Sequence, residues 1–259
     1  MNYVLTETDG RVRRIVLNRP AQRNLLTPQM MTALADALKN AGDARVIVIA
    51  SDGPAFCAGH DMKGMASHFT DEDGGRAAFT ALFDQCSDLM STIAALPQPV
   101  IAEVHSVAVA AGCQLVAACD MAIAADTAKF GTTGVRFGLY CSTPAVPLTR
   151  VVGAKQATEL LMTGDVIDAD AAAAMGLINR AVPADQLTAE TMALAHRIAA
   201  NSGAVLALGK TAVREQAGAD LTAAYARASR AMVDNLMLND GREGLAAFAQ
   251  KRHPEWHDS

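Results

Sequence analysis

Short hydrophobic runs separated by polar turn residues fill the first half of the chain and predict β-strands. Residues 3–7 and 11–17 are β-prone runs on either side of Asp9-Gly10, and an Asp-Gly pair in that place is typical of a hairpin turn. Later runs are almost purely apolar, which favours strands that are buried on both faces. These runs are residues 46–50, 100–104 and 121–125, with a shorter β-like piece at 177–182.

Helical patterns alternate with these strands and take over in the second half. Thr27 before Pro28 predicts a helix N-terminus, and Met30, Leu34 and Leu38 then repeat at the spacing of one helical face. Further helices are expected over residues 73–95 and 111–119, and almost throughout after residue 143. The pattern predicts an α/β core at residues 1–195 and a helical C-terminal region at residues 196–259.

Composition and charge limit the kind of protein. Although 51% of the residues are hydrophobic, no uninterrupted apolar run reaches the roughly 18 to 20 residues that span a bilayer, so we expect a soluble chain without membrane insertion. The net charge is −5 and no basic cluster occurs, which argues against a nucleic-acid partner. His253 and His257 have Pro254 between them, which works against a shared helical face, so we expect no metal site.

Cysteine usage and the N-terminal residues point to a location. The five cysteines are odd in number and lie mostly in apolar sequence, which is typical of reduced thiols. Residues 1–14 carry charges without an apolar core, and Glu7 and Asp9 argue against a transit peptide. We therefore expect a cytoplasmic protein.

Two glycine-bearing segments carry the candidate chemistry. AFCAGHDMKGM (residues 55–65) and SVAVAAGCQLVAACD (residues 106–120) each follow a β-like run and place a backbone turn at its end. The second turn opens a helix, whose N-terminus offers unpaired N–H donors and the positive end of the macrodipole. Two such donors that converge on one oxygen would form an oxyanion hole.

These segments and three others resemble the crotonase superfamily, the enoyl-CoA hydratase and isomerase family, and stand in the family's order. They are residues 15–31, 55–65, 100–131, 160–183 and 243–256. The resemblance implies a spiral of repeated ββα units that binds an acyl-CoA thioester, with coenzyme A as part of the substrate and no other cofactor. It also implies that the helical end packs against neighbouring subunits, as a homotrimer or homohexamer.

By this resemblance the oxyanion donors are the backbone N–H groups of His60 and Ala111. Ala110-Ala111 stands in place of the commoner Gly-Gly pair, and alanine fits there only if the local φ is negative. The ring of His60 either packs or serves in proton transfer. Gln114 and Gly134 occupy the positions of two glutamates used by typical hydratases, and neither can act as a base. Gln114 either orients a water or thioester or fills space.

The resemblance also suggests residues that bind the substrate. Tyr140, Cys141 and Ser142 stand where other members place a carboxylate, and Cys141 is either a nucleophile with a lowered pKa or a small loop residue. Arg136 either binds an acyl carboxylate or is a surface charge, and Phe248 and Lys251 are expected to reach a neighbour's coenzyme A site. The full expected set is Ala58, Lys63, Gly112, Arg136, Tyr140, Cys141, Ser142, Phe248 and Lys251.

The function expected from the sequence is that of an enzyme of this family, a lyase or isomerase. The alternative is a non-catalytic acyl-CoA binding paralogue that has lost its acid and base. A serine hydrolase is not supported because no GxSxG segment occurs, and neither GxxxxGK[ST] nor GxGxxG is present.

Overall fold

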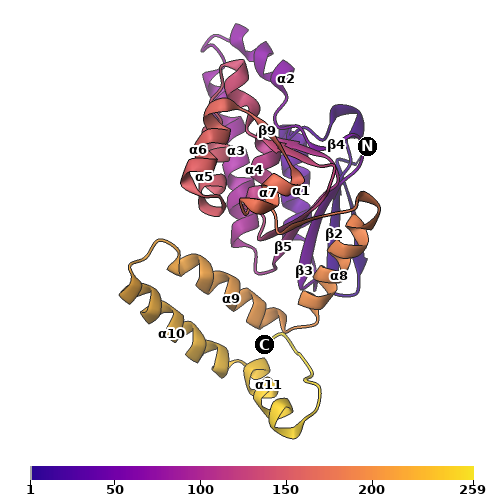
Figure 1. The fold of residues 1–259 in the computed structure, drawn as a ribbon, viewed down its shortest axis with the longest axis vertical. Helices are drawn as coiled ribbons and strands as arrows, with labels where there is room; N and C mark the ends of the chain where they lie inside the picture. The colour runs from indigo at the N-terminus through magenta and orange to yellow at the C-terminus, as the bar shows by residue number, and fades with distance from the viewer. Residues whose placement is uncertain (1) are drawn as a thin grey trace.

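The strands divide between two sheets in a computed structural model that describes residues 2–259 (Figure 1). The larger sheet has the order β1-β2-β3-β5-β7-β10, and the smaller has the order β4-β6-β8-β9. Met1 lies outside the described residues. The larger sheet contains β1 (Val4–Asp9), β2 (Val12–Leu17), β3 (Val46–Ser51), β5 (Val100–Val104), β7 (Met121–Ala125) and β10 (Arg180–Val182). The smaller contains β4 (Ala55–Cys57), β6 (Val107–Val109), β8 (Lys129–Gly131) and β9 (Val166–Asp168).

The larger sheet is parallel except for its first strand. β1 pairs antiparallel with β2 from Val4↔Leu17 to Asp9↔Val12, which confirms the hairpin predicted around Asp9-Gly10. β2, β3, β5, β7 and β10 then pair in parallel. Every residue of β5 is buried, as its apolar run predicts for a central strand covered on both faces.

From β3 to β8, consecutive strands alternate between the two sheets, and this alternation creates the spiral. β3 is followed by β4, β5 by β6, and β7 by β8, and helices follow each pair before the chain returns to the larger sheet. β4, β6 and β8 pair in parallel, so their carboxyl ends meet at one edge. The helices are α1 (Pro28–Lys39), α2 (Met62–Ser67), α3 (Arg76–Ala95), α4 (Ala111–Ala118), α5 (Ser142–Val151), α6 (Ala154–Thr163), α7 (Ala169–Ala174), α8 (Leu187–Ala199), α9 (Gly203–Gln216), α10 (Leu221–Met237) and α11 (Asn239–Gln250).

Apolar side chains cover both faces of the larger sheet. On one face, Met30 and Leu34 of α1 and Ile93 of α3 belong to a cluster that includes Ile47 and Ile49 of β3. On the other face, α8 contributes residues to a second cluster that includes Val46, Val48 and Ile101. α8 thus packs on the sheet as far as its end at Ala199, past the boundary at residue 195 expected from the sequence.

Helices α9 to α11 form an arm that projects from the sheets (Figure 1). Lys210 on α9 attaches the arm to the core, because its ammonium donates to Asp120 at 2.7 Å and to the carbonyl of Ile93 at 3.0 Å. The C-terminal tail returns to the core, where the indole of Trp256 donates to the carbonyl of Ala200. The arm keeps large apolar side chains exposed, among them Val213, Leu221, Tyr225, Met232, Val233, Met237, Leu245 and Phe248.

No helix between residues 2 and 259 combines the length and apolar character required to cross a bilayer. Within that range, no group of three or more histidine, cysteine, aspartate or glutamate side chains is placed to hold a metal ion.

Candidate functional site

Three neighbouring strand ends of the smaller sheet open into one cavity. His60 follows β4, Ala111 follows β6, and Gly134 follows β8, and all three line a cavity of about 460 Å³. Because β4, β6 and β8 are parallel neighbours, their carboxyl ends bring these positions to the same edge. The two glycine-bearing segments singled out in the sequence therefore meet in space.

The two turns touch through glycines that cannot carry a side chain. Gly59 has φ +90°, and a Cβ there would lie 3.0 Å from the Cβ of Ala110 and 3.3 Å from the nitrogen of Ala111. A Cβ on Gly112 would lie only 2.0 Å from the carbonyl oxygen of Cys57. The first turn of α4 is thus held directly against the end of β4, and Gly112 serves this close approach.

Both candidate N–H donors lack a hydrogen-bond partner within residues 2–259. The N–H of Ala110 donates to the carbonyl of Gly131 at 2.9 Å, and the carbonyl of Ala110 accepts from the N–H of Gln114 at 3.1 Å. Among residues 2–259, neither the N–H of His60 nor that of Ala111 donates a backbone hydrogen bond outside the regular elements, and Ala111 is the first residue of α4. Unpaired donors beside a cavity have the character of an oxyanion hole.

The backbone of Ala110 differs from the sequence expectation. The exchange of Gly-Gly for Ala-Ala required a negative φ, but Ala110 has φ +51° and ψ −120°. The turn imposes this conformation because the N–H of Ala110 must reach Gly131 while its carbonyl begins α4. A side chain in this region of backbone space is strained.

The ring of His60 is held by contacts with two neighbouring residues. Its Nδ1 lies 2.9 Å from the carbonyl oxygen of Leu26, and the ring meets the ring of Phe83 edge-on, with centroids 5.6 Å apart. Its Nε2 is buried and has no hydrogen-bond partner in the described residues. Burial lowers the pKa of the imidazole, and the hydrogen bond to Leu26 offsets this only in part.

The two positions that resemble glutamate sites differ in their placement. Gln114 is buried, its Oε1 lies 3.8 Å from the thiol of Cys86 on α3, and it is not among the residues that line the cavity. Gly134 does line the cavity. A Cβ on Gly134 would approach the carbonyl oxygen of Leu139 to 2.3 Å and the sulfur of Cys141 to 2.8 Å. Leu139 and Cys141 therefore fill the space that a side chain at position 134 would need.

The loop before α5 supplies one wall of the cavity. Tyr140, Cys141 and Ser142 all line it, together with Ala58 from the opposite wall. Burial raises the pKa of the Cys141 thiol, and a backbone hydrogen bond from Gly134 lowers it only in part. Of the two interpretations of Cys141, a nucleophile with a lowered pKa or a small loop residue, the raised pKa counts against the first, because desolvation at this wall outweighs the effect of the helix N-terminus.

The other five expected binding residues, including Gly112 at the contact between the two turns, lie outside the cavity lining. Arg136 is exposed and forms an ion pair with Asp165, so its charge is already partnered. Lys63 is exposed on α2. Phe248 on α11 and Lys251 just after it are exposed on the arm, and Phe248 keeps 85% of its surface accessible.

Sequence reasoning missed the apolar wall. Met62 and Met65 of α2 and Phe83 of α3 line the cavity, although neither helix belonged to the expected site beyond Lys63. Phe79 and Phe83 are four residues apart and mark one face of the predicted helix over residues 73–95. That face was the available signal, but the sequence does not show that α3 covers the two turns.

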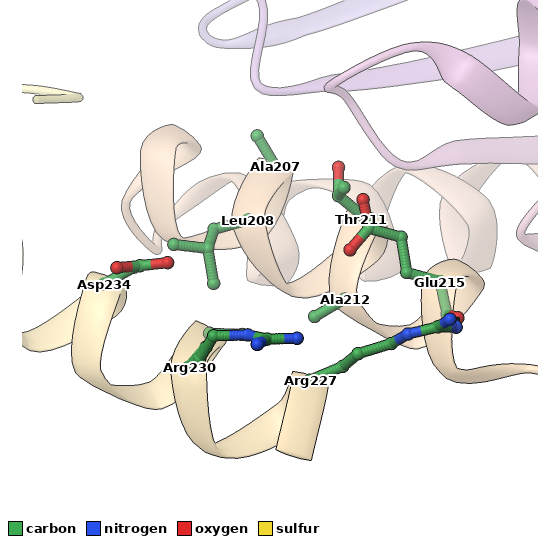
Figure 2. A pocket seen from close by; sticks show the side chains of 9 residues that line it. Ala207, Leu208, Thr211, Ala212, Glu215, Arg227, Arg230 and Asp234 are labelled. Atoms are coloured by element: carbon green, nitrogen blue, oxygen red, sulfur yellow. Dashed lines mark hydrogen bonds between the residues drawn. The ribbon is translucent and has the colours of Figure 1, made fainter. Parts of the chain in front are cut away.

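A second hollow, of about 470 Å³, lies between α9 and α10 (Figure 2). Its walls carry Glu215, Arg227, Arg230 and Asp234, and Arg227 donates to the carbonyl of Glu215. No residue of the two glycine-bearing segments lines it. The hollow belongs to the projecting arm, so the cavity at the strand ends is the candidate site.

Comparisons with known proteins identify the family of the chain. The family model described as "Enoyl-CoA hydratase/isomerase" matches residues 7–259. A mouse protein named "Enoyl-CoA hydratase domain-containing protein 3, mitochondrial" is 48% identical over 96% of this chain and 82% of its own length. The crystal structure of the human enoyl coenzyme A hydratase domain-containing protein 3 superposes with a TM-score of 0.92 at 44% identity, covering 98% of this chain and 100% of that one.

A second solved structure and the names of the relatives settle two expectations. An enoyl-CoA hydratase of Mycobacterium smegmatis superposes with a TM-score of 0.92 at 43% identity, covering 98% of this chain and 99% of that one, which confirms the crotonase fold. The cytoplasmic expectation is contradicted, because similar animal proteins are named mitochondrial. Reduced cysteines only argue against an oxidising compartment, so they could not locate the chain further. By the family match and these relatives, the chain belongs to the enoyl-CoA hydratase/isomerase family.

Proposed function

We propose that the cavity binds an acyl-CoA thioester and that the N–H groups of His60 and Ala111 polarise its carbonyl. The observation that carries this proposal is the pair of unpaired donors on two touching turns beside one cavity. Hydrogen bonds aimed at a developing oxyanion in a desolvated site contribute on the order of 3 to 4 kcal/mol per donor. The amides therefore stabilise an enolate-like state of the thioester.

The apolar wall suits the acyl chain. Met62, Met65, Phe83 and Leu139 present hydrocarbon surface beside the two turns, and an acyl chain gains free energy from leaving water. Coenzyme A enters as part of the substrate, and Lys63 at the exposed end of this region can attract its phosphates. No other cofactor is part of the proposal.

We also propose that the arm joins subunits into a homotrimer or homohexamer. Its exposed apolar side chains include Met232, Val233 and Met237 on α10. A large exposed apolar surface of this kind is unusual in a soluble monomer and typical of a subunit interface. In such an assembly Phe248 and Lys251 would reach the coenzyme A site of a neighbour. This arrangement gives the two exposed residues a role that a single chain does not.

The reaction we favour is hydration or double-bond isomerisation of an enoyl thioester. A non-catalytic acyl-CoA binding protein is the second candidate, and one observation favours it. Among the described residues that line the cavity there is no aspartate or glutamate, so its wall offers no carboxylate to act as an acid or base. Rapid hydration by two carboxylates is therefore not expected.

Thermal unfolding with and without ligand tests the binding proposal. At 100 times its Kd, a bound ester should add about 2.7 kcal/mol of apparent stability and raise the melting temperature. Acetyl-CoA and crotonyl-CoA are the probes, with free coenzyme A as the control. If neither ester shifts the transition at millimolar concentration, the proposal is wrong. Incubation with 2-enoyl, 3-enoyl and saturated esters, followed by mass spectrometry, separates an enzyme from a binding protein.

A further inference from the structure

A further hollow, of about 400 Å³, lies beside the cavity of the candidate site, and we call it the α3 hollow. It is bounded by the start of α1, by α2 and by the first turns of α3. Its apolar walls are Leu26 and Pro28 at the start of α1, Met65 on α2, and Ala78, Phe79 and Leu82 on α3. The α3 hollow has no part in the proposed function as stated above.

The α3 hollow and the cavity share a boundary. Met65 lines both spaces. Leu26 lines the hollow, and its carbonyl oxygen lies 2.9 Å from Nδ1 of His60, a residue that lines the cavity. On α3, Phe79 lines the hollow and Phe83, one turn later, lines the cavity. Helix α3 therefore runs past both spaces, and Met65 lies between them.

Met65 is the part of this boundary that can move aside. Methionine is unbranched and has three rotatable bonds, so its side chain adopts other positions at small cost. Met65 is only partly buried, whereas Leu26 is completely buried. The ring of His60 is held by Leu26 and Phe83. A ligand that extends from the cavity toward the hollow thus meets a side chain that can give way.

The polar side chains around the α3 hollow are engaged elsewhere. Thr27 caps α1 and Asp61 caps α2, each by accepting a backbone N–H. The amide of Gln85 donates to the carbonyl of Pro28 at 2.9 Å. His68 is exposed and forms an ion pair within its own turn. The surface that remains for a ligand is therefore mainly hydrocarbon.

We propose that the acyl chain of a medium-chain or long-chain thioester passes Met65 and ends in the α3 hollow. This inference rests on the proposed function, which places the thioester carbonyl at the N–H groups of His60 and Ala111. Asp61, the residue after His60, already lines the hollow, so the hollow begins next to that point. Each methylene that leaves water there should tighten binding about fourfold. Met65 and the α3 hollow thus set the preferred chain length.

Isothermal titration calorimetry with butyryl-CoA and decanoyl-CoA tests the proposal. The unmodified protein should bind decanoyl-CoA at least about tenfold more tightly, which corresponds to fewer than two buried methylenes. Ala78→Phe puts a ring into the hollow, because Ala78 lines the hollow and not the cavity. It should weaken decanoyl-CoA about tenfold and leave butyryl-CoA unchanged. Ala77→Phe is the matched control, since Ala77 is exposed, lines neither space and lies on the same helix.

Met65→Ala separates a movable boundary from a simple wall. Removing the side chain takes a contact away from butyryl-CoA but opens the way into the hollow for the longer ester. The ratio of decanoyl-CoA affinity to butyryl-CoA affinity should therefore rise. If Met65 were only a wall of the cavity, both esters would weaken by the same factor, and that result would overturn its assigned role.

Photolabelling locates the chain end in the unmodified protein, so it does not depend on the folding of a variant. Decanoyl-CoA with a diazirine at C9 should, on irradiation, label residues that line only the hollow, such as Leu82 and Gln85, as read by tandem mass spectrometry. Label confined to residues that line only the cavity would overturn the proposal. So would equal affinities of the unmodified protein for the two esters, or of Ala78→Phe and Ala77→Phe for decanoyl-CoA. These results leave the binding of butyryl-CoA, and with it the proposed function, standing. A protein that binds neither ester would overturn both.

Discussion

The strained turn at Ala110 allows the oxyanion hole to be tested in two steps. Ala110→Gly relieves a side chain at φ +51° and ψ −120°, and such strain costs about 1 to 3 kcal/mol. Glycine loses about 0.5 to 1 kcal/mol more backbone entropy on folding. The variant should therefore be more stable by about 1 kcal/mol, which urea unfolding can measure as a higher midpoint with an unchanged m-value.

The second step removes a donor. Ala111 is the first residue of α4, a position where proline is tolerated because its missing N–H would be unpaired anyway. In the Ala110→Gly background, Ala111→Pro deletes the N–H proposed to face the thioester oxygen. The loss of one oxyanion donor lowers kcat by about 10² to 10³-fold. Turnover of a 3-enoyl thioester, or exchange at C2 of butyryl-CoA, supplies the rate.

Ala110→Gly alone is the matched control, since it shares the altered turn and keeps both donors. It should retain the rate of the unmodified protein. A double variant that is folded, as shown by circular dichroism, and turns over as fast as the single variant would refute the role proposed for the N–H of Ala111. An Ala110→Gly variant that is less stable than the unmodified protein would refute the strain argument separately.

Other expected outcomes concern packing, pH and assembly. Gly134→Ala should destabilise the fold by more than about 1 kcal/mol, since its Cβ would lie 2.3 Å from the carbonyl of Leu139; an unchanged urea midpoint would contradict this close approach. Because the folded pKa of His60 is lowered, its contribution to stability is complete above about pH 6.5 and is lost as pH falls. Unfolding midpoints between pH 7 and pH 5 should thus fall less steeply for His60→Ala, and equal slopes would count against this. Light scattering should report a trimer or hexamer, and a monomer at micromolar concentration would contradict the proposed assembly.

The larger sheet was predictable and the smaller one was not. The apolar runs at residues 46–50, 100–104 and 121–125 match β3, β5 and β7, because buried parallel strands need no polar face. β4, β6 and β8 have three residues each, too few to show a period. Their pairing depends on the spiral path of the chain, which the family resemblance supplied and local pattern did not.

The backbone turns of the candidate site were predictable from the sequence, but the placement of its side chains was not. Glycines at positions 59 and 112 indicate that two backbone segments come close together. In the structure Gly59 lies against Ala110 and Ala111, and Gly112 lies against Cys57. Side-chain placement depends on tertiary packing. The side-chain oxygen of Gln114 lies next to the thiol of Cys86, and Arg136 forms an ion pair with Asp165. Likewise Phe83 reaches the cavity from α3, and nothing in its local sequence shows which turn that helix covers.

The central claim is that the N–H groups of His60 and Ala111 polarise a thioester carbonyl. Infrared difference spectra of acetyl-CoA labelled with ¹³C at the carbonyl measure this directly, because two hydrogen bonds weaken the C=O bond and lower its stretching frequency. We predict a lower carbonyl frequency in the bound ester than in water, and a smaller shift with the Ala110→Gly/Ala111→Pro variant. A bound ester with the same frequency as the free one would contradict the claim.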